Sequence, residues 1–218
     1  MNYQIDAPGS AIRTTVKLPA SKSISNRALI LNALSYSAYD VENLSDCDDT
    51  NLMVKALNSN DRDFNVGAAG TTMRFLTAFL SKVVGEWTIT GTERMKNRPI
   101  KVLVDALNAL GARIEYMEKE GYPPLRIFGS ALQGGEISLP GNVSSQYISA
   151  ILMIAPLTES GVTLHLEGAI ISRPYIHITL QLMEQYGVRA SWTENTIKVL
   201  PQEYKPIRFT VESDWSAA

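Results

Sequence analysis

The segment Ser21-Lys22-Ser23-Ile24-Ser25-Asn26-Arg27 precedes an apolar run at residues 28–34. This pattern predicts a helix whose first turn carries hydroxyls, an amide and two cations. The N–H groups of a first helical turn lack partners within the helix and carry partial positive charge, so they favour an anion. Lys22 supplies a point charge, and Arg27 supplies a planar fork that suits phosphate or carboxylate. This segment alone leaves open the alternative of a Ser-rich N-cap with solvated cations.

Two similar segments give the chain an internal repeat. Gly70-Thr71-Thr72-Met73-Arg74 and Val143-Ser144-Ser145-Gln146 each precede an apolar helix pattern, which ends near residues 80 and 154. A short strand pattern and then a second helix pattern follow each start. The second helices share motifs, since Arg98-Pro99 resembles Arg173-Pro174 with proline near a helix start. The expected single strands are 39–44, 87–90 and 162–167, and the expected hairpins are 112–117 with 125–128 and 188–192 with 196–199.

These patterns predict an α/β fold made of three β-α-β-α-β-β units with pseudo-threefold symmetry. The first unit should be shorter, because residues 58–65 leave little room for its hairpin. The apolar runs at 28–34 and 148–155 are hydrophobic nearly all round, so we expect helices inside and sheets outside. Symmetry would bring the three helix starts to one end and form one anion-binding face. The cations near these starts are Lys22, Arg27, Arg74, Arg94, Lys96, Arg98 and Arg173.

Composition is typical of a globular chain with a sizeable core. The 218 residues are 45% hydrophobic and carry a formal net charge of −2, so no bulk basic field points to nucleic acid or membrane. Cys47 is the single cysteine, which fits a reducing, cytoplasmic setting. The sequence begins with no signal-peptide pattern, and no apolar run approaches the roughly 18 residues of a membrane span.

Several other chemically suggestive residues are expected to be structural. His165 lies in a strand pattern and His177 in a helix pattern, and no Cys/His/Asp spacing suggests a metal site. The neighbouring carboxylates are expected to raise the pKa of Cys47 and make it a poor nucleophile. The cluster Asp46, Asp48 and Asp49 is expected to cap a helix that begins near Thr50.

At this point the motifs resemble a known family, the 5-enolpyruvylshikimate-3-phosphate (EPSP) synthases, also called 3-phosphoshikimate 1-carboxyvinyltransferases. The similarity lies in segments that follow the family order and cover nearly the whole chain. They are Leu18-Pro19-Ala20-Ser21-Lys22-Ser23-Ile24-Ser25-Asn26-Arg27, Ala69-Gly70-Thr71-Thr72-Met73-Arg74, Arg94-Met95-Lys96-Asn97-Arg98-Pro99-Ile100, Val143-Ser144-Ser145-Gln146-Tyr147, Ser172-Arg173-Pro174-Tyr175-Ile176 and Val211-Glu212-Ser213-Asp214.

The resemblance implies the fold of this family, an inside-out α/β barrel, and transfer of the enolpyruvyl group of phosphoenolpyruvate to the 5-hydroxyl of shikimate 3-phosphate. The reaction is a step of aromatic amino-acid biosynthesis, and we expect it to need no cofactor and no metal. The implied phosphoenolpyruvate ligands are Lys22, Gly70 and Arg98, and Arg74 and Arg94 are expected to brace the loop. Gly70 and Tyr175 also have structural alternatives, a tight turn and a half-buried core ring. The implied shikimate 3-phosphate ligands are Ser23, Arg27, Ser144, Ser145, Gln146, Ser172 and Tyr175.

The family has two domains with the active site between them, and the resemblance places the acid/base carboxylates on the second. We therefore expect no catalytic residue in this chain and no turnover by it alone. Residues 14–210 are expected to form the substrate-anchoring domain. Residues 1–13 and 211–218 are expected to cross to the second domain and to be poorly buried here. We expect the chain to be truncated before that domain, and the complete protein to be monomeric.

Two departures and two alternatives accompany the resemblance. Ala68 stands where many members carry Asn, and Phe75 stands where some carry Pro, so the loop over Gly70 can differ and glyphosate sensitivity stays open. A non-catalytic anion-binding module is one alternative. The other is the enolpyruvyl transferase that acts on a UDP-amino sugar. The segment 91–98 lacks the loop cysteine that this second family usually carries.

Overall fold

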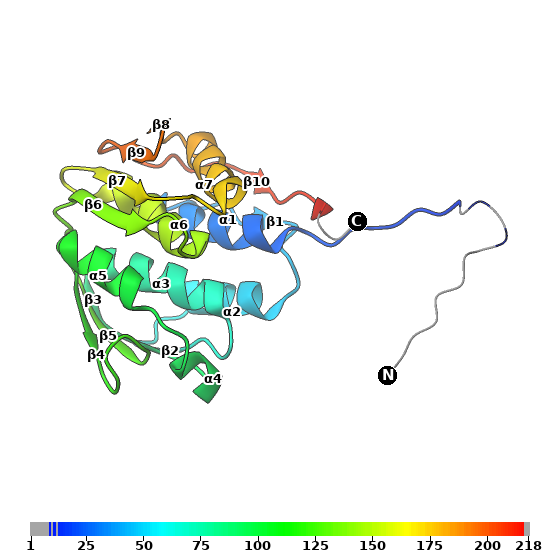
Figure 1. The fold of residues 1–218 in the computed structure, drawn as a ribbon. Helices are drawn as coiled ribbons and strands as arrows, with labels where there is room; N and C mark the ends of the chain where they lie inside the picture. Colours follow the sequence, from blue (N-terminus) through cyan, green and yellow to red (C-terminus); the bar gives the residue numbers. More distant parts are fainter. Residues whose placement is uncertain (1–8, 10, 12, 216–218) are drawn as a thin grey trace.

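The helices that begin with the three polar segments lie at the centre of the molecule (Figure 1). The computed structural model describes residues 9, 11 and 13–215. The central helices are α1 (Lys22–Leu34), α3 (Gly70–Lys82) and α6 (Ser145–Ile154). Nine of the ten residues of α6 are buried, and so are eleven of the thirteen residues of α3. Helices that are apolar nearly all round are buried on all sides, which confirms the expected interior helices.

Two four-stranded sheets cover these helices from opposite sides in Figure 1. The first has the order β2-β3-β5-β4 and the second β6-β7-β9-β8. In both, the first pair is parallel and the other two pairs are antiparallel. The identical topology confirms the repeat. The strands are β2 (Asp63–Asn65), β3 (Gly85–Thr90), β4 (Arg113–Tyr116), β5 (Leu125–Gly129), β6 (Gly135–Pro140), β7 (Val162–Glu167), β8 (Ala190–Thr193) and β9 (Thr196–Val199).

The second helix of each unit is less buried. These helices are α2 (Asp48–Leu57), α5 (Lys101–Ala109) and α7 (Arg173–Gln185). Two shorter elements complete the helical part, α4 (Glu93–Lys96) before α5 and the 3₁₀ turn η1 (Ala155–Leu157) after α6. Glycines with positive φ follow two of them, at Gly111 (98°) and Gly187 (88°), where a left-handed residue commonly ends a helix. Pro174 lies in the first turn of α7, whereas α5 begins only after the Arg98-Pro99 pair.

Among the residues that the structure describes, the first unit has no hairpin, as its short connection predicted. Its strand β1 (Val41–Glu42) is shorter than expected and pairs in parallel with β10 (Phe209–Thr210). The segment β10 therefore takes the place that β2 and β6 take in their units. Within the described residues, no strand pairs with the other edge of β1. A groove of about 540 Å³, lined in part by Leu29, Leu57 and Phe79, lies beside β1.

The segment after β10 is better anchored than the sequence suggested. Val211 is 1% exposed, and its N–H donates to the carbonyl of Glu42 at 2.9 Å. Ser213 forms a bridge with Ala20 at the start of α1. The expectation of low burial after residue 210 is therefore wrong at Val211, because the segment replaces the first strand of unit one. Of the N-terminal expectation, residues 1–8, 10 and 12 lie outside the described residues, and residues 13–17 are exposed.

Candidate functional site

The starts of the three central helices meet around one small pocket. Its volume is about 240 Å³, and all three units contribute to its wall. The arrangement follows from the repeat, since equivalent helix starts lie at equivalent places about the pseudo-threefold axis. The pocket is lined by Lys22, Ser23, Arg27, Thr71, Ser144, Ser145, Gln146 and Tyr175.

Most of the residues expected to bind shikimate 3-phosphate lie together here. Six of these seven residues line the pocket, and Ser172 does not. Ser172 is the N-cap residue of α7, one turn before Tyr175, whose N–H donates to the Ser172 carbonyl at 3.1 Å. Thr71 lines the pocket without having been predicted to. Its position directly after Gly70 in the second helix start was the signal that could have identified it.

Arg27 is the most deeply buried cation of the pocket. It is 2% exposed, and its Nε and Nη2 donate to the hydroxyls of Thr179 and Ser149 at 2.7 and 2.9 Å. Its Nη1 donates to the Ser23 carbonyl at 2.9 Å. One N–H on each terminal nitrogen is left over, because a guanidinium has five. Burial lowers the pKa of Arg27 to about 10, so an anionic ligand would offset the cost of this desolvated charge.

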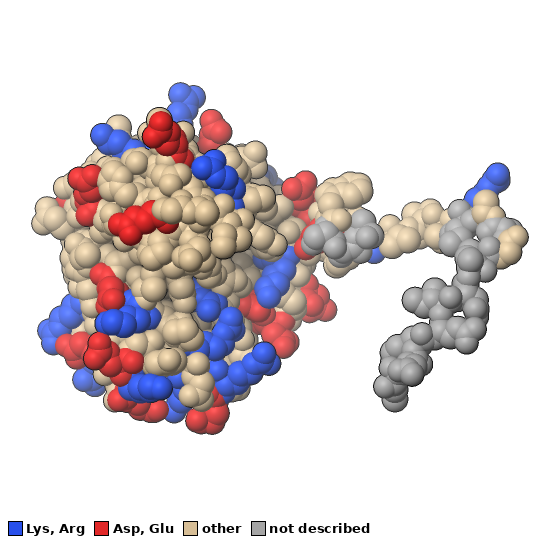
Figure 2. All heavy atoms as spheres, viewed as in Figure 1, with Lys and Arg blue, Asp and Glu red and all other residues tan. Residues whose placement is uncertain are grey.

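The arginines near the pocket differ from the other cations of the molecule. Figure 2 shows Lys and Arg mixed with Asp and Glu on the surface, and several of these form ion pairs, such as Arg126 with Glu86 at 3.1 Å. Within the described residues, no carboxylate lies within ion-pair distance of Arg27, Arg74 or Arg98. The net positive charge is therefore concentrated at the helix starts in a chain of near-neutral charge.

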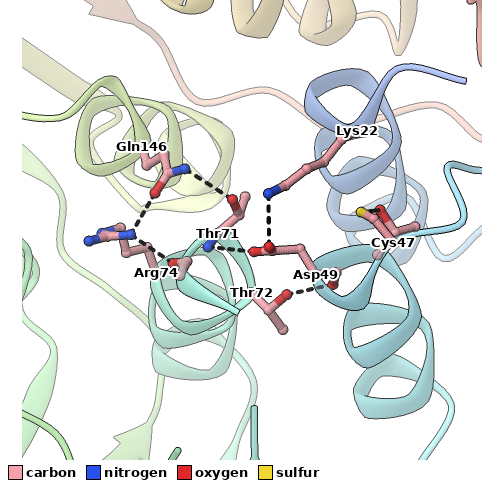
Figure 3. A network of polar contacts seen from close by, with 9 residues as sticks. Lys22, Cys47, Asp49, Thr71, Thr72, Arg74 and Gln146 are labelled. Carbon is pink, nitrogen blue, oxygen red and sulfur yellow. Dashed lines mark hydrogen bonds and ion pairs between the residues drawn. The ribbon is translucent and has the colours of Figure 1, made fainter. Parts of the chain in front are cut away.

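Gln146 links the third helix start to the second (Figure 3). Its Oε1 accepts from Arg74 Nη1 at 2.6 Å, and its Nε2 donates to the Thr71 hydroxyl at 3.0 Å. Arg74 Nη1 also donates to the Gly70 carbonyl at 3.0 Å, and its guanidinium lies over the Tyr147 ring. Arg74 braces the loop as the sequence predicted, although its buried Nε has no partner.

Gly70 and Arg98 lie on the far side of Arg74, outside the pocket lining. A Cβ added at Gly70 would lie 2.4 Å from Arg98 Nη1 and 2.8 Å from Arg74 Nη1. The Tyr147 hydroxyl donates to the Pro99 carbonyl at 2.6 Å and so holds the segment that carries Arg98. Burial and the nearby Arg74 guanidinium lower the pKa of Arg98. The missing side chain of Gly70 thus lets two guanidinium groups approach the start of α3 closely, and their charges suit an anion beside the pocket.

Lys22 is held by a carboxylate that the sequence assigned elsewhere (Figure 3). Its Nζ lies 2.8 Å from Asp49 Oδ2, and Asp49 Oδ1 accepts from the N–H of Thr71 at 2.9 Å. Asp49 was expected to cap α2. Instead, the N-cap residue of α2 is Cys47, without a side-chain cap, and Asp46 accepts from Asn51. The expected capping role is therefore wrong for Asp49, which serves the neighbouring helix α3.

The expectation for Cys47 is also wrong. Burial favours the neutral thiol, but hydrogen bonds with Thr50 and Ser45 and the charge of Lys22 outweigh it and lower the pKa of Cys47. The thiol lies 3.3 Å from the Thr50 hydroxyl, and the nearby Asp49 carboxylate is engaged by Lys22. The three aspartates next to Cys47 in the sequence therefore do not determine the electrostatic surroundings of its thiol.

The histidines take part in surface contacts away from the pocket. His165 on β7 bonds Glu136 and the Thr196 hydroxyl, and His177 stacks on Trp192 with centroids 4.6 Å apart. Within the described residues, no cluster of three or more His, Cys, Asp or Glu side chains has the arrangement of a metal site. Over the same residues, no helix is long and apolar enough to cross a membrane.

Comparisons with known proteins agree on one family. The family model described as EPSP synthase (3-phosphoshikimate 1-carboxyvinyltransferase) matches residues 7–62 and 58–218. The chain is 60% identical to the 3-phosphoshikimate 1-carboxyvinyltransferase of Bacteroides fragilis strain YCH46, covering 100% of this chain and 53% of that protein. It is 42% identical to the enzyme of the same name from Vibrio campbellii, covering 97% of this chain and 56% of that protein.

A solved structure has the same fold. The EPSP synthase from Acinetobacter baumannii superposes with a TM-score of 0.81 at 21% sequence identity, over 92% of this chain and 50% of that chain. The chain thus spans about half the length of the curated relatives it matches.

Proposed function

Since the chain belongs to the EPSP synthase family, we propose that it forms the substrate-anchoring half of a 3-phosphoshikimate 1-carboxyvinyltransferase. The reaction transfers the enolpyruvyl group of phosphoenolpyruvate to the 5-hydroxyl of shikimate 3-phosphate and releases phosphate. The 5-hydroxyl gives up its proton and adds to the phosphate-bearing carbon of the enol phosphate as the methylene carbon is protonated. Loss of phosphate and of one proton from the resulting methyl group then restores the double bond. A reducing, cytoplasmic setting is part of this proposal and is supported by the single cysteine.

Shikimate 3-phosphate would occupy the pocket between the helix starts. Ser144 is the N-cap residue of α6 and Ser145 its first residue, and the hydroxyls and partial positive charge of such a helix start suit the phosphate. The unused N–H groups of Arg27 and the Ser23 hydroxyl suit the carboxylate end, and the half-exposed Tyr175 ring offers an apolar face to the substrate ring. Ser172 would need to approach from the start of α7, which lies outside the pocket lining.

Phosphoenolpyruvate would lie beside this pocket, between Lys22 and the Gly70–Arg98 contact. The bare Cα of Gly70 admits the Arg98 guanidinium, which a side chain at this position would displace. Lys22, with a half-exposed side chain, lies at the boundary and can reach either anion. Both substrates carry several negative charges, and their binding in a partly dehydrated site needs fixed cations of this kind.

The observation that carries the proposal is the buried Arg27, which has no carboxylate partner and lines a pocket formed by all three units. A buried charge without a counter-ion is costly unless a ligand supplies one. Within the described residues, the pocket lining includes no aspartate or glutamate that could exchange protons with a substrate. The acid and base of the reaction would therefore come from the second half of the enzyme.

The test measures phosphate release from phosphoenolpyruvate plus shikimate 3-phosphate. The chain joined to a second half of the kind its relatives carry should release phosphate, and the Arg27→Ala variant of that protein should lose most of this activity. The 218-residue chain alone should release none. Activity that survives Arg27→Ala unchanged would contradict the site assignment, and turnover by the chain alone would contradict the division of the chemistry.

A further inference from the structure

Asp49 is a nearly buried carboxylate that contacts the pocket wall without lining the pocket. Its side chain is 15% exposed, against 46% for its partner Lys22. The residue lies in the first turn of α2, whereas the pocket is lined from α1, α3, α6 and α7. Both carboxylate oxygens are engaged, one by the Lys22 ammonium and the other by the N–H of Thr71.

The backbone of Asp49 is engaged as well. Its carbonyl accepts from the Thr72 hydroxyl at 2.6 Å, so α2 is attached twice to the first turn of α3. Thr71 in turn accepts from Gln146, which accepts from Arg74. Asp49 thus lies between Lys22 and Thr71 in a continuous chain of polar contacts that joins Lys22 to the start of α6 (Figure 3).

This arrangement has a clear consequence for Lys22. Within the described residues, Asp49 is its single ion-pair partner, and a lysine on a flexible stem loses rotamer entropy when its ammonium is fixed. The carboxylate fixes the ammonium in advance and leaves two of its three N–H groups for a ligand. Lys22 and the Thr71 N–H keep the pKa of Asp49 below its usual value despite burial, so the carboxylate stays ionised at neutral pH.

We propose that Asp49 is a positioning residue, which holds the Lys22 ammonium and the first turn of α3 in the geometry that receives the substrate anions. This inference rests on the proposed function, since it names a further residue that its site requires. Asp49 acts through Lys22 and Thr71 and does not touch the substrate.

The opposite effect is also conceivable on electrostatic grounds. A carboxylate behind Lys22 repels an approaching anion, and its removal would then strengthen binding. The geometry favours positioning, because the Asp49 charge is already compensated by two short contacts that face it. The two effects have opposite signs, so one variant separates them.

The variant is Asp49→Asn, which keeps the shape and an oxygen for the Thr71 N–H but loses the charge. Calorimetric titration of the 218-residue chain with shikimate 3-phosphate should show affinity weakened roughly tenfold or more, the effect of losing one charge-assisted contact. In the Lys22→Met background the same change should have almost no effect, because the lysine is absent and the asparagine oxygen still accepts from the Thr71 N–H. An equal loss in both backgrounds would mean a purely structural role, and tighter binding would mean repulsion; either would overturn the proposal.

Asp105→Asn is the matched control, since Asp105 pairs with the exposed Lys101 at 3.3 Å away from the pocket. It should leave the affinity unchanged. A loss as large as that of Asp49→Asn would show that any aspartate of this kind matters and would contradict the specific role.

A second readout needs no substrate, and its first comparison is made within the wild-type chain. In nitrogen-15 NMR spectra, the ammonium protons of Lys22 should exchange with water several-fold more slowly than those of the exposed Lys198, which has no ion pair within the described residues, and Asp49→Asn should abolish the difference. Equally fast exchange in the wild-type chain would overturn the proposal. If the wild type binds no shikimate 3-phosphate while Lys22 exchanges slowly, the proposed function fails, and titration with inorganic phosphate in place of the ester then decides the positioning role alone.

Discussion

Gly70→Ala perturbs the proposed phosphoenolpyruvate site with a single methyl group. The new Cβ would lie 2.4 Å from Arg98 Nη1 and 2.8 Å from Arg98 Cζ. Normal contact needs about 3.5 Å, so Arg98 must retreat by roughly 1 Å. Arg74 is less able to move, because its Nη1 is bonded to Gln146 and to the Gly70 carbonyl. The Arg98 side chain has no such bond within the described residues, so it should be displaced.

The size of the effect follows from this displacement. A displaced Arg98 loses about one charge-assisted hydrogen bond to the ligand, worth about 1.5–3 kcal/mol, which corresponds to roughly tenfold to a hundredfold in affinity. The loss should fall on phosphoenolpyruvate and on glyphosate, which in the family occupies the same place. Shikimate 3-phosphate should lose little, because Ser144, Ser145 and Gln146 lie on another unit. The free energy of unfolding should change by less than about 1 kcal/mol, since the tip of a flexible side chain gives way.

The assay is steady-state kinetics of the two-domain enzyme, with Michaelis constants for both substrates and the inhibition constant for glyphosate. The control is the Arg98→Ala background, in which Gly70→Ala should have a much smaller effect because the displaced group is absent. Equal losses for both substrates would show that Gly70 is a folding residue, and the site assignment would have to be abandoned. Ala68 and Phe75, which depart from the common family pattern, bear on the absolute sensitivity to glyphosate but leave this comparison unchanged.

Three further predictions concern stability. Arg27→Met should abolish binding of shikimate 3-phosphate, yet the free energy of unfolding in urea should stay unchanged or rise by about 1 kcal/mol. The reason is that a buried charge without a counter-ion is removed, while the Ser149 and Thr179 hydroxyls stay bonded to each other at 2.8 Å; a large destabilisation would contradict this. Because the pKa of Asp49 is lowered, its ionisation stabilises the fold above about pH 4, and this contribution is lost as the pH falls through the lowered value. Thermal melts between about pH 2 and about pH 6 should therefore show a melting temperature that falls more steeply with acid for wild type than for Asp49→Asn. Val211→Ala should destabilise the chain by about 1–3 kcal/mol in the same unfolding assay, and no change would show that β10 is dispensable.

Much of the fold could be predicted because the repeat is written in local patterns. The apolar runs gave the buried central helices, and the strand β7 was predicted with its observed bounds, Val162–Glu167. The predicted ligands Ser23, Arg27, Ser144, Ser145 and Gln146 meet in one pocket because symmetry brings equivalent helix starts together. Local sequence therefore determined both the units and the place where they converge.

The remainder depends on contacts between units, which no local pattern encodes. Arg27 is held by Ser149 of α6 and Thr179 of α7, and neither residue stands out in the sequence from other helix residues. Asp49 was assigned to its own helix because a carboxylate near a helix start usually caps it, whereas it reaches across to α3. The parallel pairing of β10 with β1 joins residues 168 positions apart and occupies a strand position that the first unit cannot fill itself.

Calorimetric titration of the 218-residue chain with shikimate 3-phosphate and with shikimate tests the central claim most directly. The phosphate ester should bind at one site, and shikimate should bind at least about tenfold more weakly, because it lacks the group that the start of α6 is expected to receive. Equal affinity for the two compounds, or no binding of the phosphate ester, would contradict the assignment of this pocket.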